Sequence, residues 1–351
     1  MGIENVQGSP FNVQRSLHIP NLTFNEVSYI YKWYEKEINQ RIDADVIDRI
    51  YYEFNGQPGL TCWFGELLTD IYNKDTGQTI TMKHFENVFI DSCEILPNNN
   101  ILNIISKARQ LPYQEIILKL FKTDTKYAFK YDNKDINYLY MNGVIDIEKE
   151  NNKNYIRFAS PYVQKRLFSY FSDVFFSETG DLIEPFTNLD HIVTKDNLYI
   201  KNLLKLYEIY INNNKDWLLK NAPRRKDLKI FEAVYHFNLY MYLFQFLTPE
   251  KAKVWPEFPT GNGKIDIIIE YSNKIYGIEL KSYTTESSYF AAINQAAHYA
   301  VQLKINTIAL VFFVDSIDDA NRQNLEKGHL DKDTGVMVET IFINLGIGIN
   351  H

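Results

Sequence analysis

Residues 263–281, GKIDIIIEYSNKIYGIELK, decide how the C-terminal part of this chain folds. Two runs rich in Ile and Tyr, 264–270 and 275–281, are typical of β-strands. The polar pair Ser272-Asn273 between them can form a tight turn. The stretch therefore predicts a β-hairpin, and a loop centred on that pair fixes which residues face each other.

The expected pairing brings charged residues together on one face of the hairpin. Asp266 lies opposite Glu279, and Lys264 lies opposite Lys281. Alternate strand residues point to the same face, and directly opposed Cβ atoms lie about 5 Å apart. The other face collects apolar residues and is expected to be core: Ile265, Ile267, Ile269, Tyr276, Ile278 and Leu280.

The opposed carboxylates of Asp266 and Glu279 predict a bound cation. Two like charges held opposite each other destabilise a hairpin unless a positive ion lies between them. Carboxylate oxygens at this spacing suit Mg2+ or Mn2+. Gly277, on the same face, is expected to leave room for a nucleic-acid backbone to approach.

Asp266, followed after a hairpin by Glu279-Leu280-Lys281, resembles the motif of the PD-(D/E)XK nucleases. The resemblance implies that Asp266 and Glu279 bind Mg2+ (or Mn2+), with help from the backbone carbonyl of Leu280. It implies that Lys281 orients or deprotonates the attacking water. It also implies an α/β domain whose mixed sheet is flanked by helices. The family's usual Pro before the Asp is replaced here by Ile265.

A helix expected before the hairpin adds to the resemblance. Residues Asp227 to Leu247 predict a long aromatic-rich helix with Glu232 and His236 on one face. This helix is similar to the first helix of the nuclease core, whose Glu often completes the metal site, so Glu232 would be a metal ligand and a catalytic residue. A solvated helix carboxylate is the alternative for Glu232, and packing is the favoured role for His236.

A second expected helix, at 287–304, precedes an apolar strand at 307–314. Gln295 and Tyr299 share one face of this helix. The pattern resembles the QxxxY helix of several PD-(D/E)XK branches, including modules fused to AAA-like ATPases, and implies a catalytic role for Gln295. Capping and packing are the alternative roles for both side chains.

The N-terminal third carries a different pattern. Thr23, with Glu26 three residues on, predicts the start of a helix, and a second helix is expected at 44–53. The segment 56–68, GQPGLTCWFGELL, resembles the GxPGL-like lid of AAA-like (STAND-type) ATPases, and the match covers about residues 9 to 72. No Gly-rich phosphate-binding loop with Lys-Ser/Thr occurs. We therefore expect a helical lid-like remnant at 1–110 and no ATPase activity.

Residues 111–175 predict a winged helix. The expected elements are helices at 113–123 and 133–141, a turn at Gly143, wing strands at 144–148 and 155–158, a wing tip at 150–154 and a closing helix after Pro161. Lys134 is the only basic residue of the expected recognition helix and is offset by two Asp. An interdomain or regulatory role with a protein partner therefore fits better than DNA reading. Residues 176–221 predict a helical connector with an apolar stripe: Leu203, Leu204, Leu206 and Tyr207.

Composition and charge restrict the class of protein. The chain has 351 residues, of which 45% are hydrophobic, so it can build two or three domains with cores. Its two cysteines, Cys62 and Cys93, fit a reducing cytosol and argue against a disulfide framework or a Cys-based zinc site. No apolar run of membrane-spanning length and no signal-peptide core occurs. A cytoplasmic protein without membrane contact is expected, and the wealth of Asn, Ile, Lys and Tyr suggests a bacterial source.

The net charge of −7 argues mildly against a general nucleic-acid binder. A local basic cluster nevertheless precedes the first expected nuclease helix: Arg224, Arg225, Lys226 and Lys229. A solvated linker is favoured for this cluster over a phosphate contact.

The functional hypothesis rests on a nuclease-like domain at 222–351. Phosphodiester hydrolysis needs a water made nucleophilic at neutral pH and a positive charge to stabilise the transition state, which a carboxylate-held metal supplies. The first hypothesis is a Mg2+-dependent nuclease acting on nucleic acid, with DNA the expected partner. The alternative is a catalytically silent regulatory, nucleic-acid-binding or protein-binding scaffold derived from an ATPase–nuclease protein.

Overall fold

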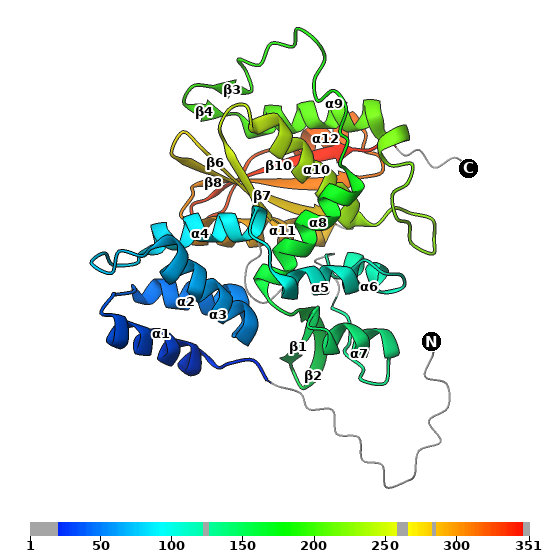
Figure 1. The fold of residues 1–351 in the computed structure, drawn as a ribbon. Coiled ribbons are helices and arrows are strands. Elements are labelled where there is room, and N and C mark those ends of the chain that lie inside the picture. Colours follow the sequence, from blue (N-terminus) through cyan, green and yellow to red (C-terminus); the bar gives the residue numbers. More distant parts are fainter. Residues whose placement is uncertain (1–19, 122–125, 258–265, 283–285, 347–351) are drawn as a thin grey trace, which may run out of the picture. The chain divides into compact units, whose positions relative to one another are not determined.

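The computed structural model describes residues 20–121, 126–257, 266–282 and 286–346 (Figure 1). For Glu257, Asp266 and Ser282 it describes the backbone and not the side chain. The chain divides into two compact units, Met1–Phe89 and Ile90–His351, and the boundary falls within helix α4 (Met82–Glu94). Each unit is described below by itself.

The first unit is helical. Its elements, besides the first part of α4, are α1 (Phe24–Ile38), α2 (Ala44–Phe54), α3 (Pro58–Glu66) and a π-helix, η1 (Leu67–Tyr72). Helix α1 begins at the expected capping box, because the Thr23 hydroxyl accepts from the Glu26 N–H and the Glu26 carboxylate accepts from the Thr23 N–H at 2.7 Å. Four phenylalanine rings form its centre: Phe54, Phe64, Phe85 and Phe89.

Gly56, in the segment that resembles an ATPase lid, is needed for its backbone conformation. Its φ is +65°, and its carbonyl accepts from the Leu22 N–H at 2.8 Å. A Cβ on this residue would lie 1.9 Å from the Leu22 oxygen. Only glycine allows both the left-handed backbone and this close approach.

The second unit begins with the elements expected for a winged helix, in the expected order. They follow α5 (Asn99–Ala108) and comprise α6 (Tyr113–Leu120), α7 (Lys134–Met141), β1 (Ile145–Glu150), β2 (Lys153–Phe158) and α8 (Pro161–Phe175). The wing differs from the expectation, because its strands are longer and its tip is the pair Asn151-Asn152 rather than the loop 150–154. Both residues have positive φ, 48° and 61°, which Asn tolerates and which a two-residue hairpin turn requires.

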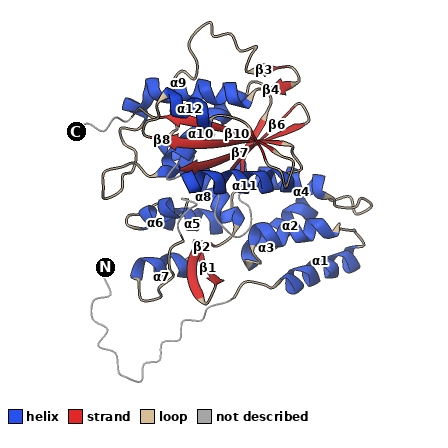
Figure 2. Ribbon diagram, turned by 180° about the vertical axis from the view of Figure 1, so that it is seen from behind, coloured by secondary structure: helices blue, strands red, loops and turns tan. Residues whose placement is uncertain are grey.

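A mixed six-stranded sheet forms the centre of the second unit (Figure 2). Its strands are β5 (Lys253–Glu257), β6 (Asp266–Tyr271), β7 (Lys274–Ser282), β8 (Thr307–Val314), β9 (His329–Leu330) and β10 (Met337–Asn344). The order across the sheet is β5-β6-β7-β8-β10-β9. Strands β7, β8 and β10 run parallel, and the other pairings are antiparallel. The chain is thus an α/β protein with a mixed sheet, as expected.

Helices cover both faces of this sheet. They are α9 (Ile200–Leu218), α10 (Glu232–Leu247), α11 (Glu286–Gln302) and, beside them, the short α12 (Asp319–Leu325). Phe312 and Phe313 are neighbours in β8 and therefore point to opposite faces. The Phe313 ring contacts Tyr207 of α9 and Tyr235 of α10, with centroids 6.4 and 5.7 Å away. The Phe312 ring contacts Tyr289 of α11 at 5.5 Å, so α11 covers the other face.

The segment expected to be a connector contributes to the sheet's cover. It contains a small hairpin of β3 (Val193–Thr194) and β4 (Asn197–Leu198) before α9. Leu203, Leu204 and Tyr207 of the expected stripe are buried, whereas Leu206 is half-buried. Because α9 packs on β10, it is a layer of the α/β fold rather than a free link.

An aromatic cluster joins the segment 113–175 to helix α10. Phe237 of α10 lies 4.9 to 6.2 Å, centroid to centroid, from four rings that belong to that segment: Phe121, Phe168, Phe171 and Phe175. Phe168 also contacts Tyr240 one turn further along α10. The two segments therefore share one core.

Candidate active site

The β6–β7 hairpin has the turn and the register that the sequence predicts. Ser272 and Asn273 form the turn with φ values of 49° and 60°. Asp266 pairs with Glu279, and Ile268 pairs with Gly277. The expected partner of Lys281, Lys264, lies outside the described residues.

Both faces of the hairpin are buried near Glu279, which differs from a hairpin with one polar, solvated face. The apolar face is core as expected, with Ile267, Ile269, Ile278 and Leu280 all fully buried. Glu279 is also fully buried, and Lys281 is 5% exposed. The reason is topological, because β7 lies between β6 and β8 and α11 covers the face that carries the charges.

Glu279 and Lys281 form an ion pair inside the protein. The Lys281 Nζ lies 3.5 Å from the Glu279 Oε1. Removing two charges from water is costly, and their attraction at this distance rarely exceeds that cost. A buried pair of this kind is therefore poor support for stability alone and suggests a chemical role.

Helix α10 is shorter than the sequence predicts and begins at Glu232, not at Asp227. The preceding residues form a turn, in which the Asp227 carboxylate pairs with Arg225 and accepts from the Lys229 N–H. Leu228 has a φ of 65°, which a helix does not allow. Glu232 consequently lies in the first turn of α10, where it is half-buried.

His236 lies one turn after Glu232 and is 1% exposed. Its ring packs on Phe313 at 5.8 Å, and neither ring nitrogen has a hydrogen-bond partner among the described residues. Burial lowers the pKa of His236 to about 3; the positive charge of Lys281 lowers it further, and the negative charge of Glu279 opposes this. These effects indicate that the start of α10 lies near the Glu279–Lys281 pair, and His236 packs as expected.

The basic cluster before α10 is engaged within the protein. Arg225 pairs with Asp227, which is the main reason that the pKa of Arg225 is raised, and Glu232 contributes to the same shift. The Lys229 Nζ lies 3.4 Å from an oxygen of Asp315. These ion pairs favour the expected solvated surface over a phosphate contact.

Gln295 and Tyr299 occupy different environments on α11. Gln295 is exposed, whereas Tyr299 is 7% exposed and packs in the layer between α11 and the sheet. Within the described part of the chain, no hydrogen bond joins Gln295 to Glu279 or Lys281. The structure thus brings Glu279 and Lys281 together and leaves Gln295 at the surface of α11.

The expectation that Gly277 leaves room for a nucleic-acid backbone is wrong. A Cβ on Gly277 would lie 3.0 Å from the Cδ1 of Ile305 and 3.4 Å from the side chain of Ile308. These two side chains fill the space beside Gly277. The glycine therefore serves packing between β7 and the α11–β8 connection.

The oxygen groups near the hairpin fit a hard divalent cation. The Glu279 carboxylate and the Leu280 carbonyl lie on β7, and Asp266 is paired with Glu279 on β6. Mg2+ and Mn2+ prefer such oxygen ligands. Among the residues whose side chains are described, three or more His, Cys, Asp or Glu do not gather as a metal-binding group, and the Asp266 side chain is not one of them.

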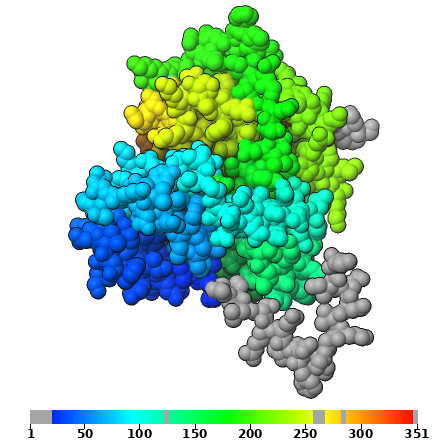
Figure 3. Space-filling model, viewed as in Figure 1, coloured from blue at the N-terminus to red at the C-terminus, as the bar shows by residue number. Residues whose placement is uncertain are grey.

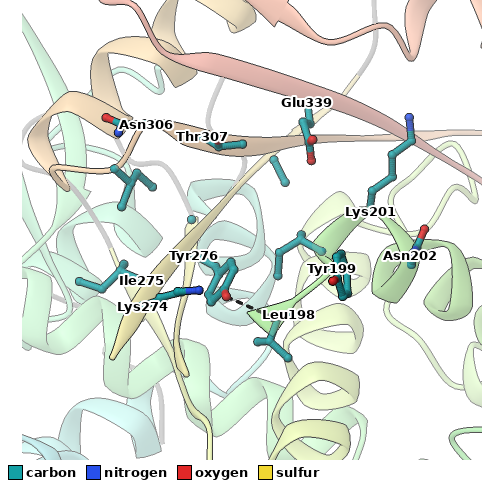
Figure 4. A pocket seen from close by; sticks show the side chains of 14 residues that line it. Leu198, Tyr199, Lys201, Asn202, Lys274, Ile275, Tyr276, Asn306, Thr307 and Glu339 are labelled. Carbon is teal, nitrogen blue, oxygen red and sulfur yellow. Dashed lines mark hydrogen bonds between the residues drawn. The ribbon is translucent and has the colours of Figure 1, made fainter. Parts of the chain in front are cut away.

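A cavity of about 610 Å³, which the sequence did not indicate, lies at the other end of the hairpin (Figure 4). Its walls come from the start of α9, the starts of β7 and β8, and β10. Its charged residues are Lys201, Lys274 and Glu339. These residues are far apart in the sequence and share no spacing pattern, so only the fold brings them together.

Comparisons of the chain with protein-family models, with curated proteins and with solved structures found no match. In the part of the chain that the structure describes, no helix is long and apolar enough to cross a membrane.

Proposed function

We propose that this protein is a metal-dependent nuclease whose site is built on the β6–β7 hairpin. The carrying observation is the pairing of Asp266 with Glu279 in the antiparallel register, with the Lys281 Nζ 3.5 Å from a Glu279 oxygen. Asp266, Glu279 and Lys281 are the residue types that the PD-(D/E)XK motif requires at this spacing. Nucleic acid, with DNA the first choice, is the proposed substrate.

The order of elements around the hairpin supports the same proposal. Helix α10 precedes three antiparallel strands, β5, β6 and β7; helix α11 and the parallel strand β8 follow. This helix–three strands–helix–strand arrangement is the one that the nuclease resemblance implies. The upstream helices agree with the proposed lid-like and winged-helix segments in their order along the chain.

Each residue has a defined task in the proposed site. Glu279 and Asp266 would hold Mg2+ or Mn2+ with the Leu280 carbonyl, and Glu232 is a further candidate ligand. The metal would supply a nucleophilic water and stabilise charge on the phosphate. Lys281 would orient that water and offset the phosphate charge from its position beside Glu279.

A catalytically silent scaffold is the second candidate, because the Glu279–Lys281 pair is enclosed. Glu279 is fully buried and Lys281 is nearly so, and the cavity described above lies at the other end of β7. A phosphodiester must reach the metal to be cleaved. Without an opening of the α11 side, the hairpin would keep its charges for structure, and a protein or nucleic-acid partner would bind elsewhere.

The test compares two carboxylates of one hairpin. Glu279→Gln removes a proposed metal ligand, whereas Glu270→Gln changes a carboxylate on β6 that is 41% exposed and pairs with Lys253 at 3.4 Å. Purified wild-type protein is incubated with single- and double-stranded DNA and RNA, with Mg2+, Mn2+ or EDTA. We expect cleavage that EDTA abolishes, that Glu279→Gln lowers at least about a hundredfold, and that Glu270→Gln leaves unchanged.

Metal binding separates the two candidates. Calorimetry with Mn2+ should detect a site in the wild type and in Glu270→Gln that is lost in Glu279→Gln. If the wild type cleaves none of the four substrates and binds Mn2+ no better than Glu279→Gln, the scaffold replaces the nuclease.

A further inference from the structure

The cavity at the start of β7 has features of a ligand site that is separate from the Glu279–Lys281 pair. It lies at the turn end of the β6–β7 hairpin, and Lys281 lies at the opposite end of β7. Its volume of about 610 Å³ falls within the range of roughly 300–1,000 Å³ that is typical of small-molecule sites. The adjoining surface joins two distant segments: Tyr271 donates to the Thr194 oxygen at 2.8 Å, and in Figure 3 yellow atoms of this region border green ones.

One wall of the cavity carries a carboxylate with no partner in the described structure. Glu339 stands on β10, directly beside its strand partner Ala309, and is half-buried. Figure 4 shows its side chain directed into the cavity. No hydrogen bond or ion pair joins the Glu339 carboxylate to any residue in the described ranges, so both of its oxygens are available to a ligand.

The opposite side of the cavity carries positive charge that is not neutralised. The Lys274 Nζ donates to the Asp196 carbonyl at 3.1 Å and to the Asn197 side-chain oxygen, and the Lys201 Nζ donates to the Glu326 carbonyl at 3.3 Å. These acceptors are uncharged, and neither lysine forms an ion pair with a described residue. The N-terminus of α9 lies at the same wall, with Tyr199 as an N-cap whose side chain makes no cap. The helix dipole adds to the positive potential there.

Two tyrosines supply aromatic surface and a donor between these charges. The Tyr276 hydroxyl accepts from the Leu198 N–H at 3.1 Å, so its own hydrogen remains available to donate to a ligand. Tyr199 is 46% exposed and can stack on a planar ring. The cavity thus presents an acceptor on one side, positive charge on the other and ring surface between them.

We propose that this cavity binds a guanine nucleotide. The N1–H and N2–H groups of guanine are adjacent donors that match the two oxygens of the Glu339 carboxylate. The base would lie against Tyr199 and Tyr276, and the phosphate would lie toward Lys201, Lys274 and the start of α9. Adenine offers a single amino donor beside a ring acceptor, which a carboxylate repels, so the site would select guanine.

The test uses calorimetric titration of the full chain with GMP, IMP and AMP. IMP keeps N1–H and lacks the N2 amino group, so it should bind about tenfold more weakly than GMP, and AMP more weakly still. Glu339→Gln should weaken GMP binding at least about tenfold and change AMP binding by less than about twofold. Glu184→Gln, a change at an exposed residue outside the cavity, is the matched control.

Several results would overturn the proposal: no saturable GMP binding at millimolar ligand, equal affinity for GMP and AMP, or unchanged GMP affinity in Glu339→Gln. The nucleotide series on the wild type decides the question even if a variant folds poorly. The proposal is independent of the nuclease. Glu279→Gln should therefore bind GMP as the wild type does, and a loss of GMP binding there would place the guanine contact at the hairpin instead.

Discussion

The wing hairpin β1–β2 and the central hairpin β6–β7 have the same local design and different surroundings. Each turns through two residues with positive φ, Asn151-Asn152 in the wing and Ser272-Asn273 in the sheet. Each carries charged residues on one face. In the wing, Arg157 and Asp146 pair across the strands at 3.1 Å, and their side chains are 42% and 30% exposed. In the sheet, the Glu279–Lys281 pair is buried.

This difference separates surface charge from charge that has a cost. An exposed ion pair contributes about 0 to 1 kcal/mol, so its presence in the wing needs no special explanation. A buried pair loses its hydration, and hydrophobic residues of similar size often serve stability equally well. The charges on β7 are therefore better explained by a chemical task, and four experiments can break or sharpen this comparison.

The largest expected effect is on stability when one charge of each pair is removed. Lys281→Met leaves the buried Glu279 carboxylate without this partner and should lower the free energy of unfolding by about 3 to 5 kcal/mol. Arg157→Met in the wing should lower it by less than about 1 kcal/mol. Urea denaturation followed by circular dichroism measures both. Glu279→Gln combined with Lys281→Met should recover most of the loss, and equal effects of Lys281→Met and Arg157→Met would remove the contrast between the hairpins.

The second effect concerns pH, because His236 beside the central hairpin stays neutral when folded. Its pKa is lowered to about 3 in the folded protein, against an ordinary value of 6.5. Below pH 6.5 the unfolded chain binds a proton that the folded protein does not, so stability falls with falling pH, by roughly 1 kcal/mol per pH unit. This contribution is complete above about pH 6.5 and is lost as the pH falls toward 3. Unfolding midpoints between pH 7.5 and 5 should decline less steeply in His236→Phe, and parallel slopes would contradict the assignment.

A third, smaller effect tests the layer that covers the charged face of β7. Gly277→Ala would place a Cβ 3.0 Å from the end of the Ile305 side chain, which must shift. The expected loss is about 1 kcal/mol, because the obstructing atom belongs to a flexible side chain. Combining Gly277→Ala with Ile305→Val should relieve the clash. A neutral or stabilising Gly277→Ala on its own would mean that the face is more open than described.

The smallest effect comes from the turns themselves. Replacing Ser272-Asn273 by Asn-Gly should stabilise the protein by about 0.5 to 1 kcal/mol, because Ser is strained at a φ of 49° and Asn-Gly suits this turn. Replacing Asn151-Asn152 by Asn-Gly should gain less, since the first position already holds Asn. Thermal unfolding measures both changes. A larger gain in the wing would show that the turns differ in more than sequence.

Local features of this chain could be predicted from the sequence, and features set by distant contacts could not. The register of Asp266 with Glu279 and the capping box at Thr23 depend on residues within one turn or one hairpin, and both are found. The burial of Glu279 depends on α11 and β8, which single-strand periodicity does not describe. The late start of α10 depends on side-chain bonds of Asp227 that compete with the helix.

The candidate site shows the same division. The motif residues of the central hairpin were predicted, and their pairing is observed. Gln295 was placed by helical spacing and is found exposed, because periodicity shows which residues share a face and not what that face meets. Glu339 and Lys274 line one cavity although 64 positions separate their numbers, and no sequence spacing connects them.

The aromatic cluster around Phe237 also limits how this chain can have been assembled or divided. Recombination preserves folding when breakpoints fall where few contacts cross them. A breakpoint anywhere between Phe175 and Glu232 would separate Phe237 from the four rings that cover it. Either fragment would then expose aromatic surface that is now buried. The segment 113–175 and the sheet with its helices are therefore expected to be inherited, expressed and lost together, as one unit of exchange.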